Sequence, residues 1–458
     1  MSLPRSSHQL LARLARQAAQ ALAHLRALGA DHAEVRIDHG HSLAATVRDG
    51  ALEQLSEAQS LGLALRVVVG GRVAAVTTSD LRADALAVML ARAVELAQLA
   101  EEDPLAEPPP PRALARRWPE LDVFDASLAR LGADRASRLA QLAEAAALAA
   151  DPRIVASGGA MCSRTINHSL LATSGGFVGP SATTRVALRV QVIAEDAAGH
   201  KRSGHYWSGG RHLQSLDPPE VVGREAAQRA LRCLGAAPIP SGVYPVVFSP
   251  EAGAGLIGLV AGCLLGDAVA RQRSYLARRL GTRIASPLVT LVDDPLRARG
   301  PASRGFDGEG RPTRRRVLVR HGELLGFLLD TASAHRLDLA PTASASGGGG
   351  LVHPSPSNFY LQAGRRGPRA LYTGLRRGLL VRTTLGLGFD PGTGHFSRGA
   401  EGVLIEDGQL TRPVAGVTLS RNLDELLQGI DAVANDFELR TAVASPSFRV
   451  DAMTIAGA

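Results

Sequence analysis

Residues 101–111 read EEDPLAEPPPP, and this proline-rich stretch decides how the rest of the chain divides. Each proline fixes its own φ angle and removes a backbone donor, so the stretch is excluded from helix interiors and central strands. We therefore interpret it as an extended connector that separates two folded units.

The unit before the connector has the pattern of a helix, four strands and a second helix. Apolar residues between Leu11 and Leu25 recur at steps of three and four, which predicts an amphipathic helix that ends at Gly29. Alternating residues and turn signals such as Asp49-Gly50 predict the strands. The strands are expected at 33–37, around the turn within 44–55, at 61–69 and at 72–77, and the second helix at 81–99.

The unit after the connector repeats this order. Its elements are expected to be a helix at 133–150, strands around 154–159, 163–173, 182–195 and 200–208, and a helix at 219–234. Because the order of elements is the same while residue-level similarity is weak, we infer an internal structural duplication.

From Val243 onward short strands dominate. They are expected at 245–248, 288–292, 316–319, 324–329, 359–361, 378–383, 402–406, 409–414 and 447–455, with helices at 251–265, 331–337 and 423–433. The sequence therefore predicts an α+β fold with two domains. Residues 1–240 form an α/β domain with units at about 1–103 and 120–240, and residues 241–458 form a mostly β domain that is curled or barrel-like.

Composition excludes several classes of protein. The chain has 458 residues, of which 45% are hydrophobic and 21% charged, values that are ordinary for globular proteins. Its net charge of +8 comes almost entirely from scattered arginines, with Lys201 the only lysine, and the short arginine clusters lack interleaved aromatics. We therefore expect neither a nucleic-acid partner nor, without an apolar run of about 18 to 20 residues, a membrane span.

The cysteines point to a reducing compartment. Cys162, Cys233 and Cys263 lie far apart and form no CxxC pair, which gives no sign of a disulfide framework or a cysteine zinc site. We expect a cytoplasmic protein.

No catalytic motif stands out from the residues alone. A zinc peptidase needs at least three ligands and usually a neighbouring glutamate. His32-Ala33-Glu34 and His321-Gly322-Glu323 have the wrong spacing for one metal, and no serine elbow of the form G-x-S-x-G occurs. The glycine run 347–350 is not followed by Lys-Ser/Thr, so we interpret it as a flexible loop near a cleft or interface.

The richest polar cluster is formed by His200, His205 and His212 with Tyr206 and Trp207. It is compatible with a metal or ligand site. On an edge strand, however, such groups more often form a solvated surface, and we favour that interpretation.

Longer stretches resemble one family. Residues 306–315, FDGEGRPTRR, followed by 326–330, GFLLD, resemble the acidic turn, Thr-Arg pair and Asp-terminated strand of the TldD/PmbA family. Further stretches that resemble this family are 31–36, 47–50, 62–67, 358–361, 391–400 and 435–438.

The resemblance also locates what this chain lacks. The catalytic subunit of the family, TldD, carries His-Glu-x-x-x-His on the helix after the first strand of the C-terminal domain, and a cysteine ligand near the C-terminus. When the Gly266-Asp267 pair is used as the anchor, the two histidines and the glutamate fall on Ile257, Gly262 and Gly258, and no cysteine follows Cys263. This is the pattern of the TldE (PmbA) subunit, so the resemblance implies no metal or other cofactor in this chain and zinc in a partner.

The function implied is that of a non-catalytic subunit in a zinc metalloprotease complex that hydrolyses unfolded peptides or matures peptide precursors. Its expected partner is a TldD-like catalytic subunit in a heterodimer, with a homodimer as the alternative. We expect Asp330, His395, Ser397 and Arg398 to line the peptide cleft, although capping the helix 331–337 or closing the turn before Gly399 would also explain them. Two other functions stay open: an active metallopeptidase or other hydrolase, and a stand-alone peptide-binding maturation factor.

Overall fold

The N-terminal half is built on one long, curved, antiparallel sheet. The structure is a computed structural model that describes residues 3–105, 107–348 and 351–457. The strand order in the sheet is β3-β2-β1-β4-β5-β6. The strands are β1 (His32–Arg48), β2 (Ala51–Val69), β3 (Arg72–Thr78), β4 (Ile154–Thr173), β5 (Val178–Glu195) and β6 (Lys201–Gly210).

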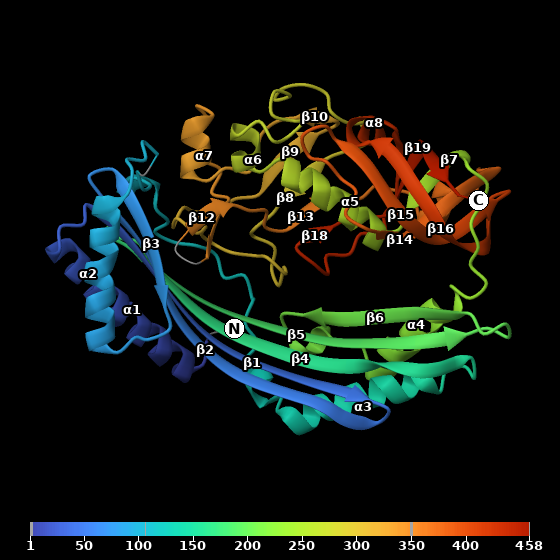
Figure 1. The fold of residues 1–458 in the computed structure, drawn as a ribbon, viewed down its shortest axis with the longest axis horizontal. Helices are drawn as coiled ribbons and strands as arrows, with labels where there is room; N and C mark the ends of the chain where they lie inside the picture. The colour runs from blue at the N-terminus through green and yellow to red at the C-terminus, as the bar shows by residue number, and fades with distance from the viewer. Residues whose placement is uncertain (1–2, 106, 349–350, 458) are drawn as a thin grey trace.

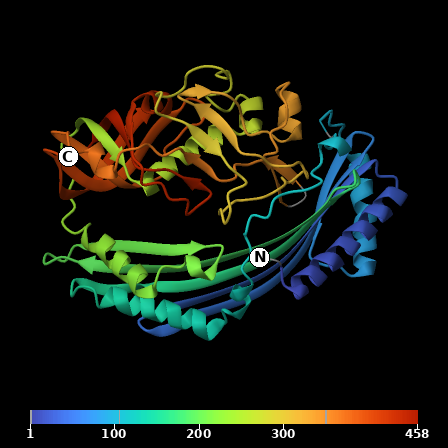
Figure 2. The same ribbon diagram turned by 180° about the vertical axis from the view of Figure 1, so that it is seen from behind.

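Four helices cover one face of this sheet: α1 (Arg5–Ala27), α2 (Ala83–Leu99), α3 (Ala133–Leu148) and α4 (Pro219–Leu231). Val35 and Ile37 of β1 pack in the core under α1 and α2, whereas Leu43 and Val47 pack in the core under α3 and α4. All four positions are odd, and alternate residues of a strand share a face. The other face is therefore left free of helices, and the C-terminal region lies on that side (Figures 1 and 2).

The duplication is visible in the sheet itself. Each unit contributes three strands and two helices, and β1 and β4 lie side by side at the centre, so the strand order is symmetric about their pairing. Each unit has three strands where we expected four. Residues 33–37 and 44–48 are parts of one strand, because residues 39–42 between them pair with both neighbouring strands. We expected two strands there because residues 39–42 interrupt the apolar alternation. Likewise 154–159 and 163–173 both belong to β4.

A closed barrel forms the heart of the C-terminal region. Its sheet has the order β16-β15-β14-β7-β19-β17, and β16 also pairs with β19, which closes a ring of five strands. The mixed α+β fold with a barrel-like C-terminal part is thus confirmed. The elements are β7 (Gly242–Phe248), β14 (Arg377–Leu385), β15 (His395–Glu406), β16 (Gln409–Asn422), β17 (Ile430–Val433), β19 (Phe448–Ala456), α5 (Pro250–Cys263), α6 (Gly266–Ala270) and α8 (Leu423–Gln428).

A second sheet of short strands lies beside the barrel, in the order β10-β9-β8-β13-β18. Its elements, with a nearby hairpin and helix, are β8 (Leu291–Asp293), β9 (Arg316–Arg320), β10 (Glu323–Leu324), α7 (Thr331–Arg336), β11 (Ala345–Gly348), β12 (Leu351–Pro354), β13 (Phe359–Leu361) and β18 (Val443–Ala444). Short 3-10 turns occur at Pro111–Ala113, Ala126–Arg130, Leu213–Ser215 and Pro368–Leu371.

Several expectations for this region were wrong in detail. The strand expected at 288–292 is only Leu291–Asp293, as β8. The helix expected at 423–433 ends at Gln428, and Ile430–Val433 instead pairs with β19 as β17. The strand expected at 324–329 keeps only its first residue in β10. Gly347 and Gly348 lie in strand β11 rather than in a loop, while 349 and 350 fall outside the described residues.

The described helices include none that is both long enough and apolar enough to cross a membrane.

Candidate functional site

Helix α5 carries the three positions that the resemblance assigns to the metal site, two for histidine ligands and one for the glutamate that takes a proton. It begins where the Ser249 hydroxyl accepts a hydrogen bond from the Ala252 N–H and where Pro250 occupies the first turn. Ile257 is fully buried, with Leu256 and Val260, in the core of the barrel region. The side chain at this position is therefore part of the apolar core.

The two glycine positions face open space. A Cβ atom on Gly258 would approach only Val443, at 3.9 Å, and one on Gly262 would meet no atom within 4 Å. Zinc binds sulfur, nitrogen and oxygen ligands, and Ile257, Gly258 and Gly262 have side chains with none of them. These residues do not fit a zinc ion. In the described ranges no group of three or more His, Cys, Asp or Glu residues is placed to hold a metal.

Two of the three cysteines are buried away from any such role. Burial raises the pKa of Cys263, the last residue of α5, to about 12, so its thiol stays protonated. Cys162 has a pKa of about 12 for the same reason. The segment that would carry the family's cysteine ligand contains Val443 and Ala444, which pair in parallel with β13.

The expected cleft residues lie in two separate places. Asp330 is 5% exposed and is the N-cap of α7, where its carboxylate accepts a hydrogen bond from the Ser333 N–H at 2.8 Å. His395, Ser397 and Arg398 lie on β15, at the barrel, well apart from α7 (Figure 1). Over the chain as described, no hydrogen bond or ion pair joins the two places, so the four residues do not form one constellation.

His200, His205 and His212 also lie apart from one another. Nδ1 of His200 lies 3.2 Å from an Asp196 oxygen in an exposed turn, and His205 is exposed within β6. His212 is buried beyond the end of β6, with Nε2 2.8 Å from the Asp122 carbonyl oxygen. Five residues of extended strand, roughly 17 Å, separate His205 from the end of β6 at Gly210. They do not form a shared metal or catalytic site.

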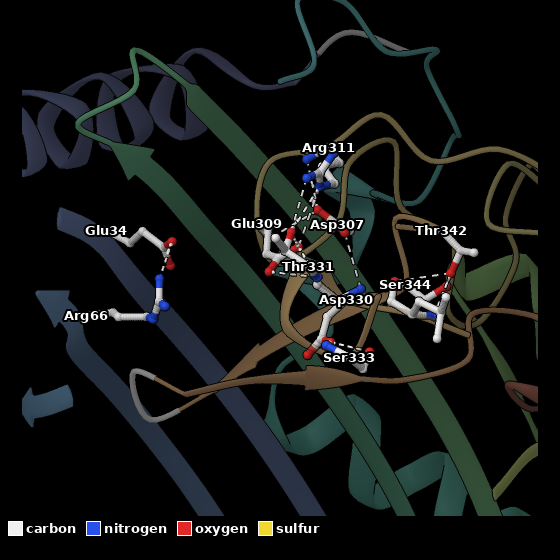
Figure 3. Close-up of polar contacts among 12 residues, drawn as sticks. Glu34, Arg66, Asp307, Glu309, Arg311, Asp330, Thr331, Ser333, Thr342 and Ser344 are labelled. Carbon is white, nitrogen blue, oxygen red and sulfur yellow. Dashed lines mark hydrogen bonds and ion pairs between the residues drawn. The ribbon is translucent and has the colours of Figure 1, made fainter. Parts of the chain in front are cut away.

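A buried acidic turn is the feature that residue types did not reveal as a site. One carboxylate oxygen of Asp307 accepts the N–H groups of Glu309 and Arg311, at 3.0 and 2.9 Å, and the other accepts the Ala345 N–H at 3.2 Å. The Glu309 carboxyl binds the N–H and hydroxyl of Thr331, at 3.1 and 2.7 Å. Figure 3 shows these groups between the turn and the start of α7. The turn is thereby fixed against that helix.

The charges of this acidic turn are strongly perturbed. Burial, reinforced by the neighbouring Asp307, raises the pKa of Glu309 to about 8. Burial raises the pKa of Asp307 as well, and that of Glu34, which reaches toward the turn from β1 and forms an ion pair with Arg66 at 3.1 Å. Both oxygens of the Glu309 carboxyl are engaged with Thr331 and Arg311, within the C-terminal half. The same turn also contacts the N-terminal part of the chain, because the Gly310 carbonyl oxygen accepts a hydrogen bond from the Ala115 N–H at 2.8 Å.

Comparison with known families decides the relationship. Residues 241–457 match the model of the PmbA/TldA metallopeptidase C-terminal domain, 126–234 the central domain and 33–97 domain 1 of the same family. The chain belongs to the PmbA/TldD family. In chain order, the three matched ranges correspond to the first unit, the second unit and the C-terminal region that contains the barrel.

Members of the PmbA/TldD family resemble this chain over nearly its whole length. The metalloprotease PmbA of Escherichia coli O157:H7 is 31% identical over 93% of this chain and 92% of its own. A TldD homologue of Haemophilus influenzae, also named a metalloprotease, is 27% identical over 72% of this chain and 73% of its own. Family membership in a group of metallopeptidases is therefore shown by sequence.

Solved structures confirm the PmbA/TldD fold. A crystal structure from Bacteroides thetaiotaomicron superposes with a TM-score of 0.90 at 26% identity and covers 97% of this chain and 98% of its own. TldE from Thermococcus kodakarensis superposes with a TM-score of 0.87 at 20% identity and covers 96% and 100%. At that identity the second match shows the fold alone.

Proposed function

We propose that this chain is the non-catalytic, TldE-like subunit of a cytoplasmic TldD/TldE-type zinc metalloprotease complex that hydrolyses unfolded peptides or matures peptide precursors. The observation that carries this proposal is helix α5. Its three family metal-site positions hold a core isoleucine, Ile257, and two glycines, Gly258 and Gly262. Such a helix cannot bind a zinc ion or transfer a proton. The zinc that activates the hydrolytic water belongs, in this proposal, to the partner subunit.

The role of this chain is to scaffold the complex and to shape the path of the peptide. Two features support that role: the face of the N-terminal sheet that no helix covers, and the open side of α5 at Gly255 and Gly262. Strand β6 is at one edge of the sheet, and no described strand pairs with its outer side. An extended peptide can bind such an edge through main-chain hydrogen bonds, which give affinity with little sequence preference.

The test is to purify the chain alone and together with a TldD-like protein that carries His-Glu-x-x-x-His. We expect no stoichiometric zinc in the isolated chain, and hydrolysis of an unstructured peptide only in the mixture. Chelator should abolish that hydrolysis. Hydrolysis by the isolated chain that survives chelator would overturn the proposal.

Two further measurements separate the other functions. If the chain were itself a hydrolase that uses the histidines around β6, His205→Ala or His212→Ala would abolish hydrolysis, whereas we expect His205→Ala to leave the activity of the complex unchanged. If the chain were a stand-alone peptide-binding factor, it would not co-purify with a TldD-like protein under native conditions.

A further inference from the structure

Four of the ten residues that line a small pocket at the end of β6 are arginines. It has a volume of about 230 Å³ and lies where β5 and β6 meet two loops of the C-terminal region. Its lining includes Arg185, Arg211, Arg299, Arg440 and Glu438. We call it the arginine pocket.

Two of these arginines already have acidic partners. Arg299 forms an ion pair with Asp122 at 2.6 Å, and Arg440 forms one with Glu438 at 2.8 Å. Arg440 also donates to the Tyr206 hydroxyl at 2.7 Å, which fixes its position beside β6. These pairs contribute no net charge to the pocket.

The other two arginines have no acidic partner. Arg211 donates to the carbonyl oxygens of Thr184, at 3.3 Å, and of Gly300, at 3.2 Å, and also to that of Pro301. A guanidinium has five N–H groups, so two remain available. The exposed guanidinium of Arg185 makes no hydrogen bond or ion pair with any residue that the structure describes. The pocket therefore holds two uncompensated positive charges.

The two unpaired arginines also repel one another. Burial, and then the charge of Arg185, lower the pKa of Arg211 to about 10. Arg211 therefore stays cationic near neutral pH. Arginine is suited to binding carboxylates through paired N–H groups.

We propose that the arginine pocket binds a carboxylate group of an extended peptide, through Arg185 and the free N–H groups of Arg211. Gly209 and Gly210, the last residues of β6, also line the pocket. A peptide that pairs with the outer edge of β6 would therefore reach the arginine pocket at the end of that strand. The inference rests on the proposed function for the nature of the ligand, a peptide, but it does not require a catalytic partner.

The test measures binding to the full chain alone at low ionic strength. The probes are fluorophore-labelled pentaalanine with a free C-terminal carboxylate, the same peptide with a C-terminal amide, and an amidated peptide with a central aspartate. Fluorescence anisotropy gives each Kd. We expect the free-carboxylate peptide to bind about tenfold more tightly than the amide, as one charge-assisted contact provides. The aspartate peptide tells whether a side-chain carboxylate serves as well as a terminal one.

Two arginine variants provide the decisive comparison. Arg185→Gln should remove most of the tenfold preference. Arg189→Gln is the matched control, because Arg189 is exposed on the same strand and, four residues on, the same face, yet lies outside the pocket. It should leave the preference intact. Arg211 is not substituted, since its hydrogen bonds join the sheet to the loop at 300–301.

Several results would overturn the inference: equal affinities for the two pentaalanine peptides, no binding of either, or equal losses in both variants. Sulfate that competes at concentrations below the peptide Kd would show a site for small free anions instead. The outcome is independent of the subunit assignment, because a chain that fails to co-purify with a TldD-like protein would still be expected to bind the carboxylate.

Discussion

Helix α5 and the acidic turn at 306–312 lie in the same half of the molecule, but α5 buries an apolar side chain whereas the turn buries carboxyl groups. At α5 the positions that the resemblance assigns to the metal site hold Ile257, Gly258 and Gly262, and Ile257 packs in an apolar core. At the turn, Asp307 and Glu309 are carboxyls that stay buried, although burial raises the pKa of each.

The difference shows that buried carboxyls are retained where hydrogen-bond donors surround them. Burying a carboxyl is unfavourable unless its oxygens are hydrogen-bonded, and the turn supplies those bonds whereas α5 does not. The turn fastens α7 and faces Glu34 of the N-terminal sheet, so its polarity serves the junction between the halves. On α5, by contrast, Ile257 packs in the core, whereas Gly258 and Gly262 face open space.

The largest effect is expected for Ile257→Asp. This variant places an unpaired carboxylate in the barrel core, which should lower the free energy of unfolding by about 4 kcal/mol or more. Ile257→Val is the control and should lose only about 1 kcal/mol, since it removes one methylene without adding charge. Urea unfolding followed by circular dichroism measures both. A well-folded aspartate variant would mean that position 257 is polar or wet, and the contrast with the turn would fail.

At the turn, Glu309→Ala should lower the free energy of unfolding by about 3 kcal/mol at neutral pH. The substitution leaves the Thr331 N–H without its acceptor and opens a space beside Arg311. Glu323→Ala, at an exposed position of the β10 hairpin, should change it by no more than about 0.5 kcal/mol. Equal effects in the two variants would contradict a structural role for the turn.

The sequence predicted the long helices well, but it predicted strand continuity and strand pairing poorly. In α1, the regular apolar spacing from Leu11 to Leu25 marks the buried face, so the helix was confirmed. The continuity of β1 through residues 39–42 was missed, because pairing with strands on both sides holds polar residues that break the alternation. In the barrel, β7 pairs with β14 and β19, which lie far along the chain, and no local pattern specifies such partners.

Only part of the candidate site could be predicted from the sequence. The apolar character of α5 follows from its residues, but the meaning of Ile257, Gly258 and Gly262 came only from the resemblance. The burial of Asp307 and Glu309 has no signal in the residues, since carboxylates in a Gly-rich turn normally face water. The arginine pocket was missed for a similar reason, because Arg185, Arg211 and Arg440 come together only when both halves are packed.

The pH dependence of stability sharpens the contrast between the two regions. Glu309 has a pKa of about 8 in the folded chain and close to 4.5 when unfolded. The stability that its protonated form provides is present below pH 4.5 and is lost as pH rises toward 8. Glu309→Gln mimics the protonated form at every pH, so it should match the parent below pH 4.5 and exceed it by a margin that grows as pH rises from 4.5 to about 8. Parallel pH curves for the two proteins, from thermal unfolding, would exclude this account.

The smallest effect is expected for Gly262→Ala, which tests the open side of α5. The added methyl meets no atom within 4 Å, and alanine favours helix over glycine, so the free energy of unfolding should rise by about 0.5 kcal/mol. Gly253→Ala, on the buried side of the same helix, should instead lower it, because its methyl would lie 2.9 Å from the Phe448 ring. If the space beside Gly262 is where the peptide passes, Gly262→Ala should also weaken peptide hydrolysis by the assembled complex while the isolated chain stays as stable as expected. A variant that is stabilised and hydrolyses peptide at the full rate would place the peptide path away from α5.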